Sequence, residues 1–128
     1  MSESLRFAPL IGRILIASLF VPAGFGKITG FQGAVGYAES AGMPVPALAI
    51  AAAIAIEFGG GLLLLVGYKT RWVAAAMALF SVVAALFFHN NFADQMQQIN
   101  FFKNIAIAGG LLNFVYFGAG PLSLDNRK

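Results

Sequence analysis

Cysteine is absent from this chain of 128 residues. Its absence excludes a disulfide framework, a CxxC redox pair and a thiolate metal site. Histidine is scarce as well, because His89 is the single example and cannot supply a haem-ligand pair or a metal cluster. The sequence also lacks a flavin-binding fingerprint. We therefore expect no metal site and no covalently bound cofactor.

Charged residues make up only 10% of the chain, whereas soluble domains carry about 25%. Hydrophobic residues make up 59%, and a soluble protein of this size cannot hide so much apolar surface from water. A lipid bilayer removes that constraint, so we expect an integral membrane protein. The net charge of +3 comes from Lys and Arg residues scattered along the chain, which does not indicate nucleic-acid binding.

Four apolar runs approach the length of about 20 residues that a membrane-crossing helix needs. They cover residues 9–29, 46–68, 71–88 and 100–117. The last two runs are slightly short, so we expect their polar ends to lie in the interfacial region. No internal repeat or linker divides the chain. The sequence therefore predicts an all-α fold, an integral membrane four-helix bundle that forms one domain over residues 1–128.

The positive charges outside these runs are divided unevenly between the two ends of the expected bundle. One end carries Arg6, Lys69, Arg71, Arg127 and Lys128. The opposite end carries the loops 31–45 and 90–99, which contain no Lys or Arg. Because cytoplasmic loops carry the excess of Lys and Arg, we expect both the N- and C-termini in the cytoplasm.

Two local features modify the simple pattern of apolar helices. Pro22 has no N–H and is soon followed by Gly24 and Gly26, which predicts a kink in the outer half of the first run. In the loop 31–45, apolar residues recur at helical spacing before Gly42, which predicts a short interfacial helix. Small residues throughout the other runs predict close helix packing.

Ionisable residues inside membrane-spanning helices are costly, so they face the bundle interior, pair or become neutral. Five lie within the runs or at their ends, namely Arg13, Lys27, Glu57, His89 and Lys103. Glu57 is close to mid-depth in the stretch IAIEFGGGLLLLVG, whereas Lys27, His89 and Lys103 are near the outer boundary. Every run contributes at least one of these residues, as a site in the core of a helical bundle requires.

Two cations are candidate partners for the Glu57 carboxylate. At about 1.5 Å per residue in straight helices, Arg13 is offset from Glu57 by about 9 Å along the bundle axis and Lys27 by about 13 Å. The long Arg13 side chain closes much of its gap, whereas a contact with Lys27 requires helix tilt, the Pro22 kink or water. The sequence therefore favours a structural ion pair between Arg13 and Glu57, with Lys27 as the alternative.

A set of short motifs covers nearly the whole chain, from about residue 10 to residue 125. The motifs are GRILIASLFVPAGFGKITGF, GMPVP, EFGGGLLLLVGYKTRWVA, FFHNNFADQ, FFKNIAIAGGLL and GAGPLSLD. They contain the ordered residues Arg13, Lys27, Glu57, His89, Lys103 and Asn104. This ordered set resembles the DoxX family of small bacterial inner-membrane proteins.

The resemblance implies a four-helix bundle, a multi-pass location in the bacterial inner membrane and a connection to oxidoreductases. Members of the family include a membrane subunit of a thiosulfate:quinone oxidoreductase, and others are associated with oxidative-stress and thiol-homeostasis complexes. Related proteins with similar bundles use cysteine pairs. Because this chain has no cysteine, the resemblance implies at most a non-cysteine membrane subunit that serves a redox partner.

The leading hypothesis is a subunit that binds a quinone or a similar small ligand near the outer polar residues. Its candidate ligand-binding residues are Lys27, Glu57, His89, Lys103 and Asn104. Aromatic side chains beside them are suited to hold a quinone ring, while the cations donate hydrogen bonds to its carbonyl groups. These aromatic residues are Phe87, Phe88, Phe101 and Phe102.

Two other functions remain open alternatives. In the first, the protein is a membrane scaffold or assembly protein whose glycine-rich faces dock partner subunits and whose charges only set the helix register. In the second, it transports a small solute or protons by means of Glu57 and the break at Pro22, several copies forming a homo-oligomer. Lys27 and Lys103 are also consistent with side chains that extend toward lipid headgroups.

Overall fold

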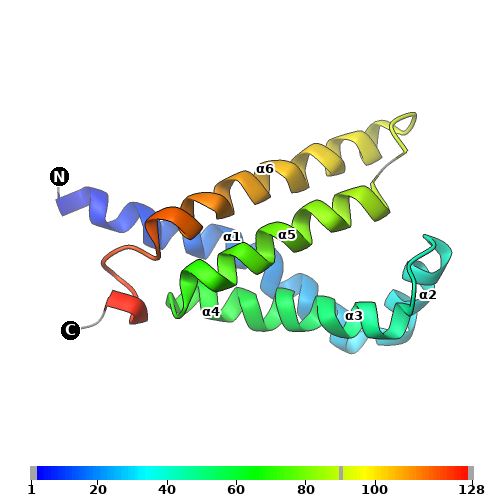
Figure 1. Ribbon diagram of the computed structural model, residues 1–128, viewed down its shortest axis with the longest axis horizontal. Coiled ribbons are helices and arrows are strands. Elements are labelled where there is room, and N and C mark those ends of the chain that lie inside the picture. The colour runs from blue at the N-terminus through cyan, green and yellow to red at the C-terminus, as the bar shows by residue number, and fades with distance from the viewer. Residues whose placement is uncertain (1–2, 90, 127–128) are drawn as a thin grey trace.

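The computed structural model describes residues 3–89 and 91–126, and this part of the chain consists of helices and connecting turns (Figure 1). The elements are η1 (Glu3–Arg6), α1 (Phe7–Thr29), α2 (Phe31–Ser40), α3 (Pro46–Ile54), η2 (Ala55–Gly60), α4 (Gly61–Val66), α5 (Thr70–Phe88), α6 (Gln95–Phe117) and η3 (Leu124–Asn126). η1 and η3 are short 3-10 helices, and η2 is a π-helical turn. The predicted all-α fold is confirmed.

The elements α3, η2 and α4 follow one another without a break and form one continuous helix over residues 46–66. Pro46 begins this helix, at a position where a backbone N–H has no helical partner to lose. Gly67 ends it with a φ of 74°, and the Tyr68 N–H donates to the Leu63 carbonyl at 2.9 Å, as in a Schellman motif. The helix corresponds to the run predicted over residues 46–68.

The first predicted run forms α1, which continues through Pro22 as a single helix of 23 residues. A proline removes one backbone hydrogen bond from a helix. The remaining bonds are retained because the hydrocarbon of a bilayer offers the backbone no other partners. Pro22 therefore does not divide α1 into two helices.

α5 and α6 form an antiparallel hairpin with the most extensive helix packing in the described chain (Figure 1). α6 begins at Gln95 rather than near residue 100. The reason is a cap: the Asp94 carboxylate accepts a hydrogen bond from the Met96 N–H at 2.9 Å. Residues 95–99 of the amide-rich segment are therefore helical.

Within the described residues, three helices are long and apolar enough to cross a membrane. They are α1, the continuous helix Pro46–Val66 and α5. α6 is as long as α1, but its polar first six residues, QMQQIN, make it less apolar than the other three. The chain is therefore a multi-pass helical membrane protein, in which α6 is a fourth long helix packed on α5.

The short helix predicted in the loop 31–45 forms as α2. It ends at Ser40, and Gly42 then adopts a φ of 83°, a conformation that suits glycine. α2 packs on α3 and on α1. It lies at the end of the molecule opposite to both termini (Figure 1).

Asp125 joins the C-terminal segment to the turn between α4 and α5. Its carboxylate accepts hydrogen bonds from the backbone N–H groups of Lys69 at 2.7 Å and Thr70 at 2.9 Å. The Asp125 N–H donates to the Gly67 carbonyl at 2.8 Å. The carboxylate thus satisfies N–H groups at the start of α5, where helical partners are missing and a negative charge is favoured.

The basic residues expected at one end of the bundle lie close to this junction. Arg6 immediately precedes α1, and Lys69 and Arg71 flank the start of α5, at the end of the molecule where both termini lie (Figure 1). Arg127 and Lys128, which the sequence predicts at the same end, lie outside the described residues. The opposite end carries α2 and the turn between α5 and α6, whose sequences contain no Lys or Arg.

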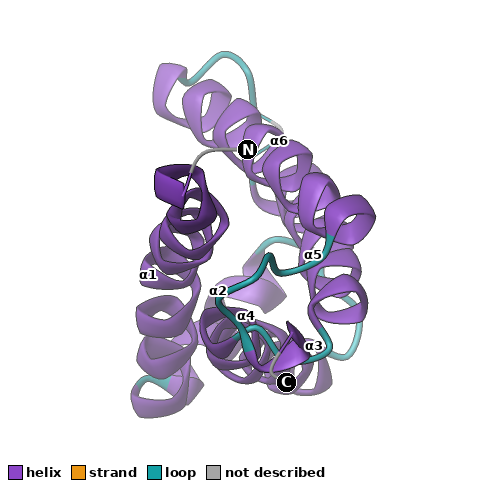
Figure 2. Ribbon diagram, turned by 90° about the vertical axis from the view of Figure 1, so that its left-hand side faces the viewer, coloured by secondary structure: helices purple, strands orange, loops and turns teal. Residues whose placement is uncertain are grey.

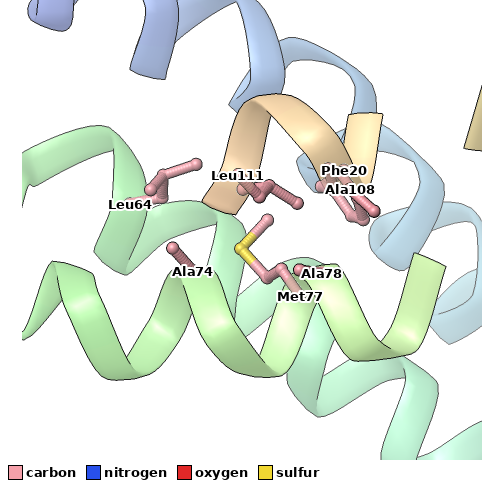
Figure 3. Packing of buried hydrophobic residues seen from close by; sticks show 7 residues of the cluster. All are labelled: Phe20, Leu64, Ala74, Met77, Ala78, Ala108 and Leu111. Atoms are coloured by element: carbon pink, nitrogen blue, oxygen red, sulfur yellow. The ribbon is translucent and has the colours of Figure 1, made fainter. Parts of the chain in front are cut away.

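A small apolar core joins α1, α4, α5 and α6 (Figure 3). It comprises Phe20, Leu64, Ala74, Met77, Ala78, Ala108 and Leu111. The alanines among them allow α5 and α6 to approach closely. Many larger apolar side chains face outward instead, for example Trp72 and Phe117, which are 81% and 70% exposed. An extensive apolar surface of this kind is suited to contact with lipid.

Two glycines allow α1 to cross the helix 46–66 with the backbones in contact. A Cβ atom on Gly24 would lie 2.6 Å from the backbone nitrogen of Phe58. A Cβ atom on Gly61 would lie 2.8 Å from a methyl group of Val21. Real side chains do not tolerate such distances, so any larger residue at either position must push the two helices apart.

We expect Gly24→Ala to lower the free energy of unfolding by about 1–3 kcal/mol, because the added methyl group displaces α1 from Phe58. The matched control is Gly26→Ala on the same helix, where an added Cβ meets nothing within 4 Å. That variant should not lose stability, because alanine favours a helix over glycine. SDS-induced unfolding in mixed micelles measures both, and equal losses in the two variants would contradict the close crossing.

Candidate functional site

The carboxylate of Glu57 forms an ion pair with Lys27 inside the bundle. The Lys27 Nζ and Glu57 Oε1 atoms are 2.7 Å apart, and the two side chains are 29% and 8% exposed, respectively. Lys27 lies in the last turn of α1 and Glu57 lies in η2. The predicted structural ion pair between Arg13 and Glu57 is therefore wrong, and the alternative partner, Lys27, makes the contact.

The helix crossing explains how Lys27 reaches Glu57. Gly24 contacts Phe58, the residue after Glu57, and Lys27 follows Gly24 by slightly less than one helical turn. Lys27 therefore lies on nearly the same face of α1 as the crossing point. An axial offset of about 13 Å between Lys27 and Glu57 requires neighbouring helix ends at the same depth. In this fold, α2 and a further turn separate the end of α1 from the start of α3.

Glu57 occupies an unusual stretch of backbone. The π-helical turn η2 runs from Ala55 to Gly60 and interrupts the α-helical pattern of residues 46–66. π-Helical turns are rare, arise mostly as single bulges within α-helices and frequently occur at functional sites. An uncommon backbone and an uncommon buried charge thus coincide at one position of the helix.

Arg13 stabilises a different part of the molecule. Its side chain is fully buried and donates four hydrogen bonds to backbone carbonyl groups. The acceptors are Leu64 at 3.1 Å, Leu65 at 2.7 Å, Ala119 at 3.1 Å and Leu122 at 2.5 Å. The first two lie in the last turn of α4, where carbonyl groups lack full helical pairing. Arg13 therefore fixes the C-terminal segment to α4.

Lys27 and Glu57 line a cavity of about 320 Å³ between the helices. Polar side chains from α1, η2, the α5 region and α6 converge on it, namely Lys27, Glu57, Ser81, His89 and Asn104. The remaining lining is almost entirely apolar. A mostly apolar cavity with a few convergent polar groups is the usual form of a small-molecule site.

The cavity brings together four of the five predicted ligand-binding residues, Lys27, Glu57, His89 and Asn104. The fifth, Lys103, does not line the cavity, and its side chain is exposed. Successive residues of an α-helix point about 100° apart. Asn104 therefore faces the cavity together with Ile107, while Lys103 faces outward.

The aromatic part of the lining differs from the expected one. Of the four phenylalanines named from the sequence, only Phe88 lines the cavity, and Phe87 is exposed. Phe101 and Phe102 instead form a cluster with Phe92, with ring centroids 5.0 to 6.0 Å apart. This cluster lies beside the start of α6 rather than in the cavity.

Three aromatic residues of the lining were missed, namely Phe20, Tyr37 and Phe80. Tyr37 reaches from α2 and stacks on Phe88, with ring centroids 5.2 Å apart and an angle of 19° between the planes. Its spacing from Ala34 on the short helix was a usable signal, because residues three apart share a face and both line the cavity. Phe20 and Phe80 gave no such signal, since phenylalanine occurs throughout the apolar runs.

His89 directly follows α5 and is held across the turn to α6. Its Nδ1 atom lies 3.2 Å from Oε1 of Gln97, within hydrogen-bond distance. An imidazole bonded through one nitrogen keeps the other nitrogen for a further hydrogen bond. His89 thus adds a positioned polar group to the cavity end that contains Lys27.

The long apolar helices, the ion pair inside the bundle and the partly polar cavity between helices define a multi-pass helical membrane protein with an internal cavity of small-molecule size. The chain belongs to the DoxX family, whose family model matches residues 8–90. The matched segment includes Lys27, Glu57 and His89, whereas Asn104 lies beyond it. The resemblance inferred from the sequence motifs is thus confirmed.

Two proteins of Escherichia coli K12 are similar to this chain along nearly its whole length. Inner membrane protein YqjF is 43% identical over 122 residues, which cover 93% of this chain and 92% of that protein. Inner membrane protein YphA is 36% identical over 123 residues, which cover 92% and 88%. With the three apolar helices, these relatives confirm the expected multi-pass location in a bacterial inner membrane. No solved structure matches the chain.

Proposed function

We propose that this protein is an inner-membrane subunit that binds a small molecule with a hydrogen-bonding head group in the cavity beside Lys27 and Glu57. The observation that supports this function is the ion pair in the wall of a mostly apolar cavity. A lysine ammonium group has three donors. The ion pair with Glu57 balances the charge of Lys27, and the ammonium group keeps donors for a ligand.

A quinone is our first candidate for this ligand. Its carbonyl oxygens accept hydrogen bonds, and those from an ammonium group are stronger than those from neutral donors. Lys27, Asn104 and His89 supply such polar groups, and the aromatic residues of the lining supply apolar surface for a ring. Since the chain has no cysteine pair, we propose that it serves a redox partner subunit.

Titration of the purified protein in nanodiscs with a short-chain ubiquinone analogue tests this proposal. We expect saturable binding by the wild type and at least about tenfold weaker binding by His89→Ala and by Asn104→Ala, the loss of about 1.4 kcal/mol for one hydrogen bond. Lys103→Ala is the matched control, because this neighbour of Asn104 faces away from the cavity, and its affinity should be unchanged.

Two results would contradict the quinone proposal. One is an absence of binding by the wild type, which would favour the scaffold function. The other is an equal affinity of the wild type, His89→Ala, Asn104→Ala and Lys103→Ala, which would place any bound quinone outside the cavity.

We further propose that α6 is a fourth membrane crossing and that both termini are cytoplasmic. A helix of 23 residues is about 34 Å long, enough for the hydrocarbon core of about 30 Å. α6 runs antiparallel to α5, and Asn104 faces the cavity rather than lipid. The excess of Lys and Arg at the end that carries the termini supports the cytoplasmic orientation.

Reporter fusions test this topology. We expect alkaline phosphatase to be inactive when fused after Lys128 and active when fused after Ala41, because only the second fusion places the enzyme in the periplasm. Activity at both positions would show that α6 does not cross the membrane. Activity at Lys128 alone would show that the orientation is inverted.

A further inference from the structure

Four helices surround the cavity, namely α1, the helix 46–66, α5 and α6. We call the boundary between two neighbouring helices a seam, and helix packing closes three of the four seams. α1 packs on the helix 46–66, this helix packs on α5, and α5 packs on α6. Within the described residues, the fourth seam, between α6 and α1, has no comparable packing. Figures 1 and 2 show that α1 and α6 lie near each other at the end of the termini and diverge toward the end of α2.

The seam between α1 and α6 is closed near the termini and open farther along. Near the termini, the ring of Phe114 lies 3.2 Å from the position of a Cβ atom on Gly12. Farther toward α2, residues of both helices line the cavity, including Leu19 of α1 and Ile107 of α6. Leu19 is nevertheless 48% exposed, so the cavity reaches the molecular surface through this seam.

The opening lies at the depth of the hydrocarbon layer. Leu19 is near the middle of α1 (Phe7–Thr29), and Ile107 is near the middle of α6 (Gln95–Phe117). The middle of a membrane-crossing helix lies within the hydrocarbon. At the end of α2, Tyr37 and Met43 line the cavity, and Tyr37, which stacks on Phe88, is 55% exposed. The seam therefore faces lipid, and the end at α2 is the alternative entrance, from water.

Both sides of the seam change from apolar to polar in the same direction. On α1, the lining residues Leu19, Ala23 and Lys27 are four residues apart and share one face. On α6, Ile107 and Asn104 are one turn apart, with the amide nearer to α2. A molecule lying along the seam thus meets apolar side chains at mid-membrane and hydrogen-bonding groups at its outer end.

We propose that the ligand enters the cavity sideways from the hydrocarbon layer through the seam between α1 and α6. The ligand is therefore a membrane-dissolved amphipathic molecule. Its hydrogen-bonding head lies at Lys27 and Asn104, and its apolar tail leaves between Leu19 and Ile107. This inference rests on the proposed function, that the cavity holds a ligand, and adds the route and the chemical class of that ligand.

Tryptophan quenching by brominated lipid tests the route without any ligand. The single tryptophan, Trp72, is replaced by phenylalanine, and Phe80→Trp then places one probe in the cavity wall. Leu79→Trp is the matched reference, because the neighbouring Leu79 is 67% exposed on the outer surface of α5. In nanodiscs of phosphatidylcholine brominated at mid-chain, we expect Phe80→Trp to be quenched at least half as strongly as Leu79→Trp.

Two results would overturn the proposed route. Quenching of Phe80→Trp by acrylamide but not by brominated lipid would show access from water. Quenching by neither agent would show that the seam is sealed, for example by a second copy of the chain. If Phe80→Trp does not fold, as judged by circular dichroism, Ile107→Trp provides the same test at the seam itself. A protein that binds no ubiquinone analogue but is quenched by brominated lipid would disprove the quinone proposal and leave the route intact.

Discussion

The pairing of Lys27 with Glu57 is the interaction on which the rest of this site depends. A charge inside a bilayer is stable only with a partner, and burying an ion costs several kcal/mol. The 2.7 Å contact requires α1 and the helix 46–66 to cross closely, which Gly24 permits beside Phe58. The same crossing holds Lys27 at the wall of the cavity instead of among lipid headgroups.

The two ends of the bundle use their charged residues differently. At the end of the molecule that carries both termini, Arg13 and Asp125 form hydrogen bonds with backbone groups. These bonds fix the C-terminal segment to α4 and α5. Those charges stabilise the fold and leave little capacity for a ligand. At the end of α2, Lys27, Glu57 and Asn104 face a cavity. A division between a structural end and the end that carries the proposed site accounts for two buried charged residues in so small a chain, Arg13 and Glu57.

The fold was largely predictable because a bilayer demands long apolar helices, and such runs are visible in a sequence. The start of α6 was not, since the Asp94 cap decides it locally. The candidate site was only partly predictable. Spacing along the chain identified Lys27 and Glu57 but not their pairing. The pairing depends on the points along α1 and the helix 46–66 at which the two helices cross. Whether Lys103 or Asn104 faces the cavity likewise depends on the rotation of α6 about its own axis. The apolar residues of α6 are not gathered on one face, so the sequence does not define that rotation.

A double-mutant cycle of Lys27→Met and Glu57→Gln, read by SDS-induced unfolding in mixed micelles, tests the ion pair most directly. The cycle should give a coupling free energy of about 1–3 kcal/mol, because Lys27→Met alone leaves a buried carboxylate unpaired and Glu57→Gln relieves that cost. The matched cycle of Lys103→Met and Glu57→Gln should give no coupling free energy, because Lys103 is exposed and does not line the cavity. Additive effects of Lys27→Met and Glu57→Gln would contradict the pairing on which the proposed site depends.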